Sequence, residues 1–372
     1  MTTEGFTPPP YPYDRLASVA DLARSHVGGM VDCSIGTPCD PPPAAVVRAL
    51  ATSGLERGYP TSAGSPALRS SAAGWIGRRF HVAISPEDVA MCVGTKEFVA
   101  STAQYLHLRN PAANVVLFPA VSYPTYAMGA RLAGLEPVAV PLDAGRLQLD
   151  AIDDETAARA LLLWSNSPSN PTGDLDDLAA AATWGRARGI PVFSDECYAE
   201  FTWADRPRTI LESGLEGVVA VHSLSKRSNL AGLRLGFYGG DPELVSYLRS
   251  VRQHAGLMVP GPVQAAGVVA LDDDVHVEEQ RRRYSDRLGL MAGALRAAGY
   301  DAVAPDGTFY LWVPVPDHLA DGWAMAEELA RRAGLLVSPG DLYGSDGADH
   351  VRIALVQDLD AIQRVVERLA SS

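Results

Sequence analysis

Short apolar runs alternate with helical patterns between about residue 65 and residue 240. The apolar runs at 114–118 and 136–140, for example, flank a helical pattern at 126–132. Such alternation predicts βαβ units, in which parallel strands form one sheet and the helices cover both of its faces. We therefore expect an α/β fold with a large domain built on a mostly parallel sheet.

The pattern changes after about residue 265. We predict helices at 275–298, 323–333 and 361–369, and short strands at 308–313, 335–337 and 350–355. Gly299 supplies the stop signal of the long helix. This part of the chain predicts a smaller α+β domain, and a length of 372 residues is more than one core normally supports. At the other end, a Pro-rich arm precedes a short helix at 17–23, and its tyrosines at 11 and 13 indicate that the arm packs on something.

Composition and charge narrow the class of protein. Apolar residues make up 47% of the chain and charged residues 20%, which is typical of a soluble globular protein. A net charge of −13 opposes binding to nucleic acid, although a cleft with a local positive field could still bind an anionic substrate. The first ten residues lack the features of a signal peptide, and no apolar run approaches the ~18 residues of a membrane helix. We expect a cytoplasmic protein with neither nucleic acid nor membrane as partner.

The four cysteines, at 33, 39, 92 and 197, form no CxxC pair and have no histidine at metal-binding spacing. This pattern favours a reducing cytosol over a disulfide or zinc framework. A bridge between Cys33 and Cys39 is the one alternative left open. No constellation of residues predicts a metal site.

The strongest chemical signal is the segment Ser223-Leu-Ser-Lys-Arg-Ser-Asn-Leu-Ala-Gly-Leu-Arg234. It follows an apolar run at 218–222, so Lys226 should lie just past the carboxyl end of a strand, where open α/β sheets bind their ligands. A lysine amine can form a Schiff base with an aldehyde, while hydroxyls and an arginine suit a phosphate. Pyridoxal 5′-phosphate carries both groups. By itself, the segment could also be an ordinary basic turn.

Three further segments place polar groups at strand ends: Asn166-Ser-Pro-Ser-Asn-Pro-Thr-Gly173, Ile190-Pro-Val-Phe-Ser-Asp-Glu-Cys-Tyr198 and Val93-Gly-Thr-Lys-Glu97. Together the four segments resemble the class I/II aminotransferases among the fold-type I pyridoxal-phosphate enzymes. The resemblance extends from Gly36 to Arg352. It implies a homodimer, pyridoxal phosphate as cofactor and no metal. It also implies that residues 1–36 join residues 266–372 in the small domain, leaving residues 37–265 as the large domain.

The resemblance also implies roles for individual residues. Lys226 would hold the cofactor and move a proton, and Asp195 would pair with the pyridine nitrogen. Tyr198 and Asn170 would donate hydrogen bonds to the phenolic oxygen of the ring, and Asn170 would also contact the substrate. Asp195 could instead cap a helix, and Asn170 could be a turn residue before proline.

The remaining assignments concern the phosphate, the ring face and the substrate. The phosphate ligands would be Gly94, Thr95, Ser223, Ser225 and Arg234, with Tyr59 from the neighbouring subunit; Lys96 would touch phosphate or substrate, or face solvent. Tyr123 would stack on the ring, although an aromatic after a strand can also be a core residue. Arg352, with the backbone at Gly36, would bind the substrate α-carboxylate, although an arginine on a strand's open face is often only solvated.

Several segments resemble N-succinyl-LL-diaminopimelate aminotransferases of actinobacteria, among them Ala220-Val-His-Ser-Leu-Ser-Lys226, His254-Ala-Gly-Leu-Met-Val-Pro260 and Ser338-Pro-Gly-Asp-Leu-Tyr-Gly344. The resemblance implies transamination between N-succinyl-LL-2,6-diaminopimelate and 2-oxoglutarate in lysine and diaminopimelate biosynthesis. A long dicarboxylate needs a second cation, for which Lys96, Arg227 and His254 are candidates. The alternatives are a general aspartate, alanine or aromatic aminotransferase, or a C–S lyase. A sensor domain of a transcription regulator is disfavoured, because the roughly thirty residues before the first strand are not basic.

Overall fold

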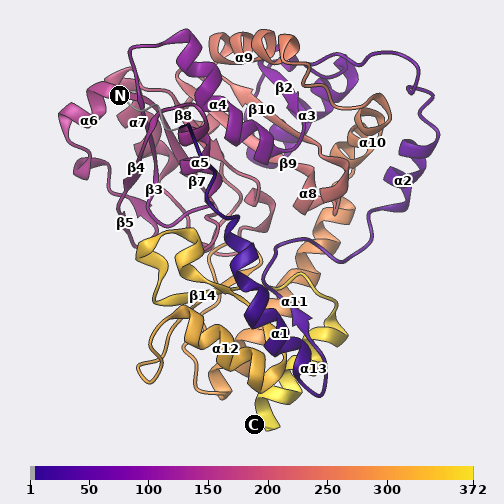
Figure 1. Cartoon of the computed structure of the whole chain (residues 1–372). Helices are drawn as coiled ribbons and strands as arrows, with labels where there is room; N and C mark the ends of the chain where they lie inside the picture. The colour runs from indigo at the N-terminus through magenta and orange to yellow at the C-terminus, as the bar shows by residue number, and fades with distance from the viewer. Residues whose placement is uncertain (1–4, 372) are drawn as a thin grey trace.

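The computed structural model describes residues 5–371. Its central sheet has seven strands in the order β2-β10-β9-β8-β7-β3-β4 (Figure 1). The strands are β2 (Val89–Cys92), β3 (Val115–Pro119), β4 (Glu136–Val140), β7 (Ala160–Asn166), β8 (Val192–Asp195), β9 (Val218–Ser223) and β10 (Gly236–Gly240). Strands β4, β3, β7, β8 and β9 run parallel, whereas β10 is antiparallel to both β9 and β2. The predicted α/β fold with a mostly parallel sheet is confirmed.

Helices cover both faces of this sheet, because successive side chains of each strand enter different cores. Val115 and Leu117 belong to one hydrophobic cluster and Val116 to another. The first cluster includes side chains from α2 (Ala44–Ala51), α3 (Pro66–Phe80), α7 (Leu178–Arg188) and α10 (Gly261–Asp272). The second includes side chains from α4 (Thr95–Arg109), α5 (Thr125–Leu132) and α9 (Pro242–His254). Strands buried on both faces read as continuous apolar runs, which is why the sequence revealed them.

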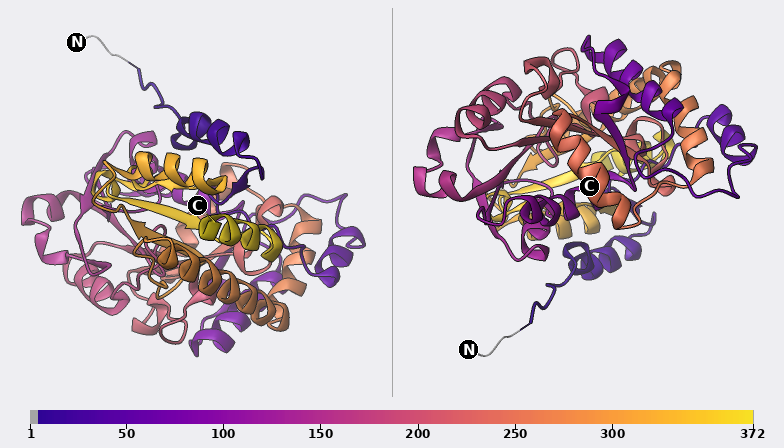
Figure 2. Two further views of the ribbon diagram at one scale, coloured as in Figure 1. Left: turned by 90° about the horizontal axis from the view of Figure 1, so that it is seen from below. Right: turned by 90° about the horizontal axis from the view of Figure 1, so that it is seen from above.

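A separate core, called the second core to distinguish it from the two clusters on the faces of the sheet, lies below the sheet in Figure 1 and is built from both ends of the chain. Its elements are α1 (Ala17–Ser25), α11 (Val275–Ala297), α12 (Gly322–Ala333), α13 (Leu359–Ser371), and strands β1 (Val31–Asp32), β11 (Tyr310–Pro314), β12 (Leu335–Leu336), β13 (Ser338–Pro339) and β14 (His350–Ala354). Helix α1 packs against α12, beside the C-terminal elements (Figure 2), and β1 pairs in parallel with β12. The N-terminal segment thus joins the C-terminal elements, while the domain bounds at 36/37 and 265/266 stay a prediction.

The remaining regular elements are short: β5 (Leu142–Asp143), β6 (Arg146–Leu147), α6 (Asp154–Arg159) and α8 (Leu224–Arg227). Two predicted strands differ from those observed. The strand expected at 308–313 begins only at Tyr310, because Thr308 has a left-handed φ of 67° that no strand residue adopts. The strand expected at 335–337 ends at Leu336 as β12, and a separate strand with a different partner, β13, follows at Ser338–Pro339.

Other expectations can be compared with the described residues. All four cysteines are free thiols in this structure. Within residues 5–371, no helix is both long and apolar enough to cross a bilayer. Over the same residues, no group of three or more His, Cys, Asp or Glu side chains is placed to hold a metal ion.

Candidate active site

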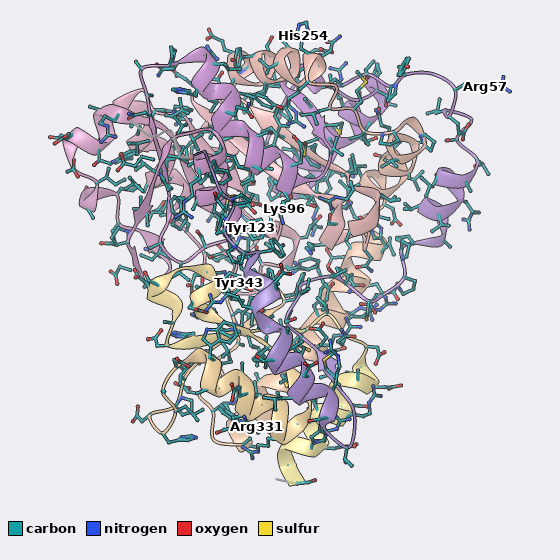
Figure 3. The ribbon with its side chains drawn as sticks, viewed as in Figure 1. Arg57, Lys96, Tyr123, His254, Arg331 and Tyr343 are labelled. Atoms are coloured by element: carbon teal, nitrogen blue, oxygen red, sulfur yellow. The ribbon has the colours of Figure 1, made fainter. Side chains whose placement is uncertain are left out.

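A cavity of about 260 Å³ lies at the carboxyl ends of the parallel strands, between the two cores. Strands β7, β8 and β9 end there with Asn166, Asp195 and Ser223. Its lining includes twelve of the predicted site residues: Gly36, Thr95, Lys96, Tyr123, Asn170, Asp195, Tyr198, Ser223, Ser225, Lys226, Arg234 and Arg352. Lys96 and Tyr123 lie close together near the middle of the molecule in Figure 3. The structure therefore gathers side chains that are more than 300 residues apart in sequence.

Lys226 lies on the single turn of α8, directly after β9. The Ser223 side chain caps this turn by accepting a hydrogen bond from the Ser225 backbone N–H at 3.1 Å. Burial, together with the nearby charges of Arg352 and Arg234, lowers the pKa of Lys226 to about 8. Its Nζ donates to the backbone carbonyl of Gly36. The amine can therefore lose its proton near neutral pH, as a nucleophile or a base must.

Asp195 is a buried carboxylate whose hydrogen-bond donors are neutral. Oδ2 accepts from the Tyr126 hydroxyl at 2.8 Å, and Oδ1 accepts from the Cys197 backbone N–H at 3.2 Å. Burial raises the pKa of Asp195, and these bonds offset the rise only in part. Asp195 does not cap a helix, because Tyr198 is the N-cap of the next helical turn, Ala199–Phe201. A cationic partner on the cavity side would complete the surroundings of this carboxylate.

Arg352 is a buried guanidinium, only 2% exposed, and its hydrogen-bond partners among residues 5–371 are neutral groups rather than carboxylates. Nη1 donates to Oδ1 of Asn170 at 2.7 Å, and Nη2 donates to the Ser34 carbonyl at 2.6 Å. Its Nε is buried with no hydrogen-bond partner. As expected from strand alternation, Val351 and Ile353 enter the second core, whereas Arg352 enters the cavity. Such a guanidinium is suited to a carboxylate ligand.

The opposite end of the cavity is suited to a phosphate. Helix α4 begins at Thr95, so its free N–H groups and helix dipole favour an anion there. Gly94 has a φ of 77°, and a Cβ at this position would lie 2.1 Å from Nη2 of Arg234. The positive φ favours glycine at this position, and the absence of a side chain leaves room for the arginine beside the helix start. Ser223 and Ser225 add hydroxyl groups to the same wall.

Three predicted residues lie elsewhere in this chain. Tyr59 is 99% exposed, on the loop marked by Arg57 at the outer edge of Figure 3, so its contact with a neighbouring subunit stays a prediction. The prediction that Arg227 lines the substrate pocket is wrong. Its Nη1 donates to the Ala270 carbonyl at 2.7 Å and its Nε faces Glu200, because adjacent helix residues point about 100° apart. The same prediction for His254 is also wrong within this chain, since it is exposed at the end of α9 and far from Lys96 (Figure 3).

The cavity residues that sequence reasoning missed include Tyr13, Tyr126, Cys197 and Tyr310. Two of them lay inside segments that the sequence had singled out, since Tyr126 follows Tyr123 by one helical turn and Cys197 lies between Asp195 and Tyr198. Tyr13 confirms that the N-terminal arm is packed, since its hydroxyl lies 3.0 Å from that of Tyr343.

Comparisons with known proteins identify the family. Residues 29–369 match the family described as aminotransferase class I and II, and the chain belongs to this family. It is 42% identical over 370 residues to a probable aminotransferase of Mycobacterium tuberculosis, covering 97% of this chain and 85% of that protein. It is 40% identical over 371 residues to the 4-dedimethylamino-4-oxo-anhydrotetracycline transaminase of Streptomyces rimosus, covering 97% and 99%.

Among solved structures, the chain is similar to a probable N-succinyldiaminopimelate aminotransferase from Thermus thermophilus. The two share 31% identity with a TM-score of 0.87, over 96% of this chain and 99% of the other. The family uses pyridoxal 5′-phosphate as its cofactor. The cavity fits this group, because it presents an amine of lowered pKa, a buried carboxylate without a cation, and an anion site at a helix start.

Proposed function

We propose that this aminotransferase moves an amino group between N-succinyl-LL-2,6-diaminopimelate and 2-oxoglutarate, in a homodimer in the cytoplasm. The single observation that supports an acidic substrate most strongly is Arg352, a buried guanidinium that faces the cavity and has no carboxylate partner in the part of the chain that the structure describes. The likeness to the Thermus thermophilus protein, which is named for the succinylated substrate, supports the choice of that substrate.

The chain's own residues divide the work at the cofactor end. When bound, pyridoxal phosphate withdraws electrons from the substrate α-carbon through its ring. Lys226 would remove and return the proton at that carbon, which its lowered pKa allows. Asp195 would pair with the ring nitrogen, and Tyr198 and Asn170 would donate to the ring oxygen. Tyr123 would cover one face of the ring.

The phosphate would be held by groups on three separate segments. Gly94 and Thr95 lie at the start of α4. Ser223 is the N-cap of α8 and Ser225 lies in its turn, and Arg234 follows with a left-handed φ of 54°. Tyr59 would reach the phosphate from the partner subunit. A site completed by two chains requires a dimer for full activity.

The substrate end uses the remaining cations of the cavity. Arg352 would bind the α-carboxylate beside the Gly36 backbone. Among the described lining residues, Lys96 is the one cation left for a distal carboxylate. The Tyr11 hydroxyl accepts a hydrogen bond from its Nζ at 3.0 Å, so the N-terminal arm holds this lysine at the cavity mouth. Burial alone would lower the pKa of Lys96, but contacts with Tyr11 and Tyr123 outweigh that effect and raise it.

A general aspartate, alanine or aromatic aminotransferase is the second candidate. The 40% identical relative from Streptomyces rimosus is named for a tetracycline-type substrate, so identity of this order is compatible with quite different amino acceptors. A C–S lyase is the third candidate, since a shared scaffold does not determine the reaction.

A coupled assay on the holoenzyme would test these alternatives. N-succinyl-LL-2,6-diaminopimelate is supplied with 2-oxoglutarate, and aspartate, alanine and phenylalanine serve as parallel donors. We expect kcat/KM to be highest for the succinylated donor. Lys96→Met should raise its KM about tenfold or more, the effect of losing one charge-assisted contact, while KM for alanine stays within a factor of two. Preference for a simple amino acid would contradict the substrate, and pyruvate release without any 2-oxo acid would indicate a lyase.

A further inference from the structure

Tyr310 contacts three of the residues to which the proposed function gives a role, and it is itself fully enclosed at 1% exposure. Its hydroxyl lies 2.7 Å from the hydroxyl of Tyr198. The Arg352 guanidinium lies over its ring, 4.2 Å from the centroid. A Cβ at Gly36 would approach the same hydroxyl to 2.2 Å, so the missing side chain there makes room for the phenol.

The backbone fixes this arrangement. Strands β11 and β14 are antiparallel, with Arg352 opposite Trp312 and Ala354 opposite Tyr310. Tyr310 is therefore a diagonal neighbour of Arg352 on the same face of the sheet, within reach of a long side chain. Its ring also meets that of Tyr198 at 5.4 Å and 65°. The phenol thus links the residue assigned to the substrate carboxylate with a residue assigned to the cofactor.

The direction of the hydrogen bond between the two phenols follows from their single protons. Each hydroxyl can donate only one hydrogen bond. If Tyr198 gives its proton to the ring oxygen of the cofactor, its own oxygen can only accept from Tyr310. Tyr310 therefore donates to Tyr198 in the loaded site. Burial raises the pKa of Tyr310 to about 12, although Arg352 and Tyr198 act to lower it.

We propose that Tyr310 is a positioning residue that transmits the occupancy of Arg352 to the hydrogen bond between Tyr198 and the cofactor. The inference rests on the proposed function of Arg352 and Tyr198. A carboxylate bound to Arg352 neutralises the cation over the Tyr310 ring, which makes the phenol a weaker donor. Tyr198 then donates more weakly to the ring oxygen, and the bound cofactor holds its proton more tightly. Other titratable or charged side chains that face the same cavity include Tyr13, Lys96, Tyr123, Asp195, Cys197 and Arg234.

Tyr343 supplies a matched control on the other side of the same guanidinium. Its ring centroid lies 4.7 Å from Arg352, and it is also buried. Its hydroxyl pairs with Tyr13 at 3.0 Å rather than with Tyr198. Tyr310→Phe and Tyr343→Phe therefore each keep a ring beside Arg352, and only the first removes the link to Tyr198.

The test is a pH titration of the absorbance of the bound cofactor in the holoenzyme, with and without saturating succinate, which cannot be transaminated. Succinate should raise the apparent pKa of the bound cofactor in the wild type. The Tyr343→Phe variant should keep most of that rise. In Tyr310→Phe the apparent pKa of the bound cofactor without succinate should be higher than in the wild type. The rise that succinate causes should be at least threefold smaller, while the affinity for succinate changes less than about threefold. As a second variant that preserves size, 3-fluorotyrosine at position 310 is a stronger donor and should lower the succinate-free pKa.

The outcomes separate the inference from the function on which it rests. An undiminished rise in Tyr310→Phe overturns the inference and points instead to Asn170, which accepts a hydrogen bond from Arg352 and is assigned to the ring oxygen. Succinate that binds the wild type without any shift also overturns it. Failure of succinate to bind the wild type contradicts the role of Arg352 in the proposed function, and the inference falls with it.

Discussion

At the scale of single residues, the site depends on positions where one atom more would collide with a neighbour. Gly94 is the clearest case, because its positive φ disfavours a side chain and a Cβ there would displace the Arg234 guanidinium. Gly94→Ala should weaken cofactor binding at least tenfold, as measured by fluorescence titration of the apoprotein. Gly232→Ala is the matched control, because Gly232 lies two residues before Arg234 and a Cβ there would meet nothing within 4 Å. Equal affinities of both variants would contradict the phosphate site.

Lys226 allows a prediction on pH dependence. Its pKa of about 8 lies below the ordinary value for lysine, so the neutral amine predominates above pH 8 and the ammonium below it. The rate at which the apoprotein takes up pyridoxal phosphate should rise about tenfold per pH unit well below 8 and level off above it, because only the neutral amine attacks. Stopped-flow absorbance measures this rate.

Variants of Lys226 and Asp195 give the controls for the cofactor-uptake experiment. Lys226→Ala should show neither the yellow colour nor turnover at any pH, and a variant that keeps both would place the aldehyde elsewhere. Asp195→Ala should still bind the cofactor but turn over at least a hundredfold more slowly, because the partner of the ring nitrogen is lost. Near-normal activity would reassign Asp195 to a structural role.

Residue chemistry was predictable from the sequence wherever a motif lay at a strand end. Lys226, Asp195 and Arg352 all reach the same cavity, as expected. Tyr310 was missed because it belongs to an ordinary strand pattern, and only the register between β11 and β14 brings it to Arg352. Arg227 was misassigned because a position in a motif does not specify which side of a helical turn a side chain occupies.

At the scale of elements, β7, β8 and β9 could be predicted because each begins with an apolar run and is buried along its whole length. The direction of β10 could not be predicted. Its five residues include three glycines, and nothing in them indicates that the strand runs antiparallel to β9. The late start of β11, after Thr308, could not be predicted either, because the left-handed backbone of Thr308 depends on contacts with distant residues. Its N–H donates to the Phe201 carbonyl, more than a hundred residues away.

The N-terminal arm is an element whose contribution can be measured. Leu16 is buried against Leu342 and Tyr343, and it anchors Tyr13, whose hydroxyl lies 3.4 Å from Nη2 of Arg352. Leu16→Ala should loosen the arm, because truncating a buried leucine typically costs about 2–5 kcal/mol of local packing. We expect KM for the amino donor to rise about fivefold or more, with kcat changed less than twofold. Steady-state kinetics would check this, with Val27→Ala as the control at an exposed position; an unchanged KM in Leu16→Ala would show that the arm does not support the substrate site.

At the scale of the whole molecule, the charge of the cavity opposes that of the chain. The net charge is −13, yet the described lining contains Lys96, Lys226, Arg234 and Arg352 against a single acid, Asp195. Low-dielectric walls strengthen such a local field and attract anions. An acidic protein can in this way bind a phosphorylated cofactor and a dicarboxylate in one pocket, as the sequence analysis allowed.

The expected dimer gives the last prediction. Tyr59 is 99% exposed in the single chain, which suits a side chain that acts in a partner's site. If so, the Tyr59→Ala and Lys226→Ala variants are each impaired alone. A hybrid dimer of one Tyr59→Ala chain and one Lys226→Ala chain has one intact site, formed by Lys226 of the first chain and Tyr59 of the second. Random mixing after subunit exchange makes half of the dimers hybrids, so about a quarter of wild-type activity should return. Activity that stays at the level of the separate variants, despite proven exchange, would place Tyr59 outside the partner's site.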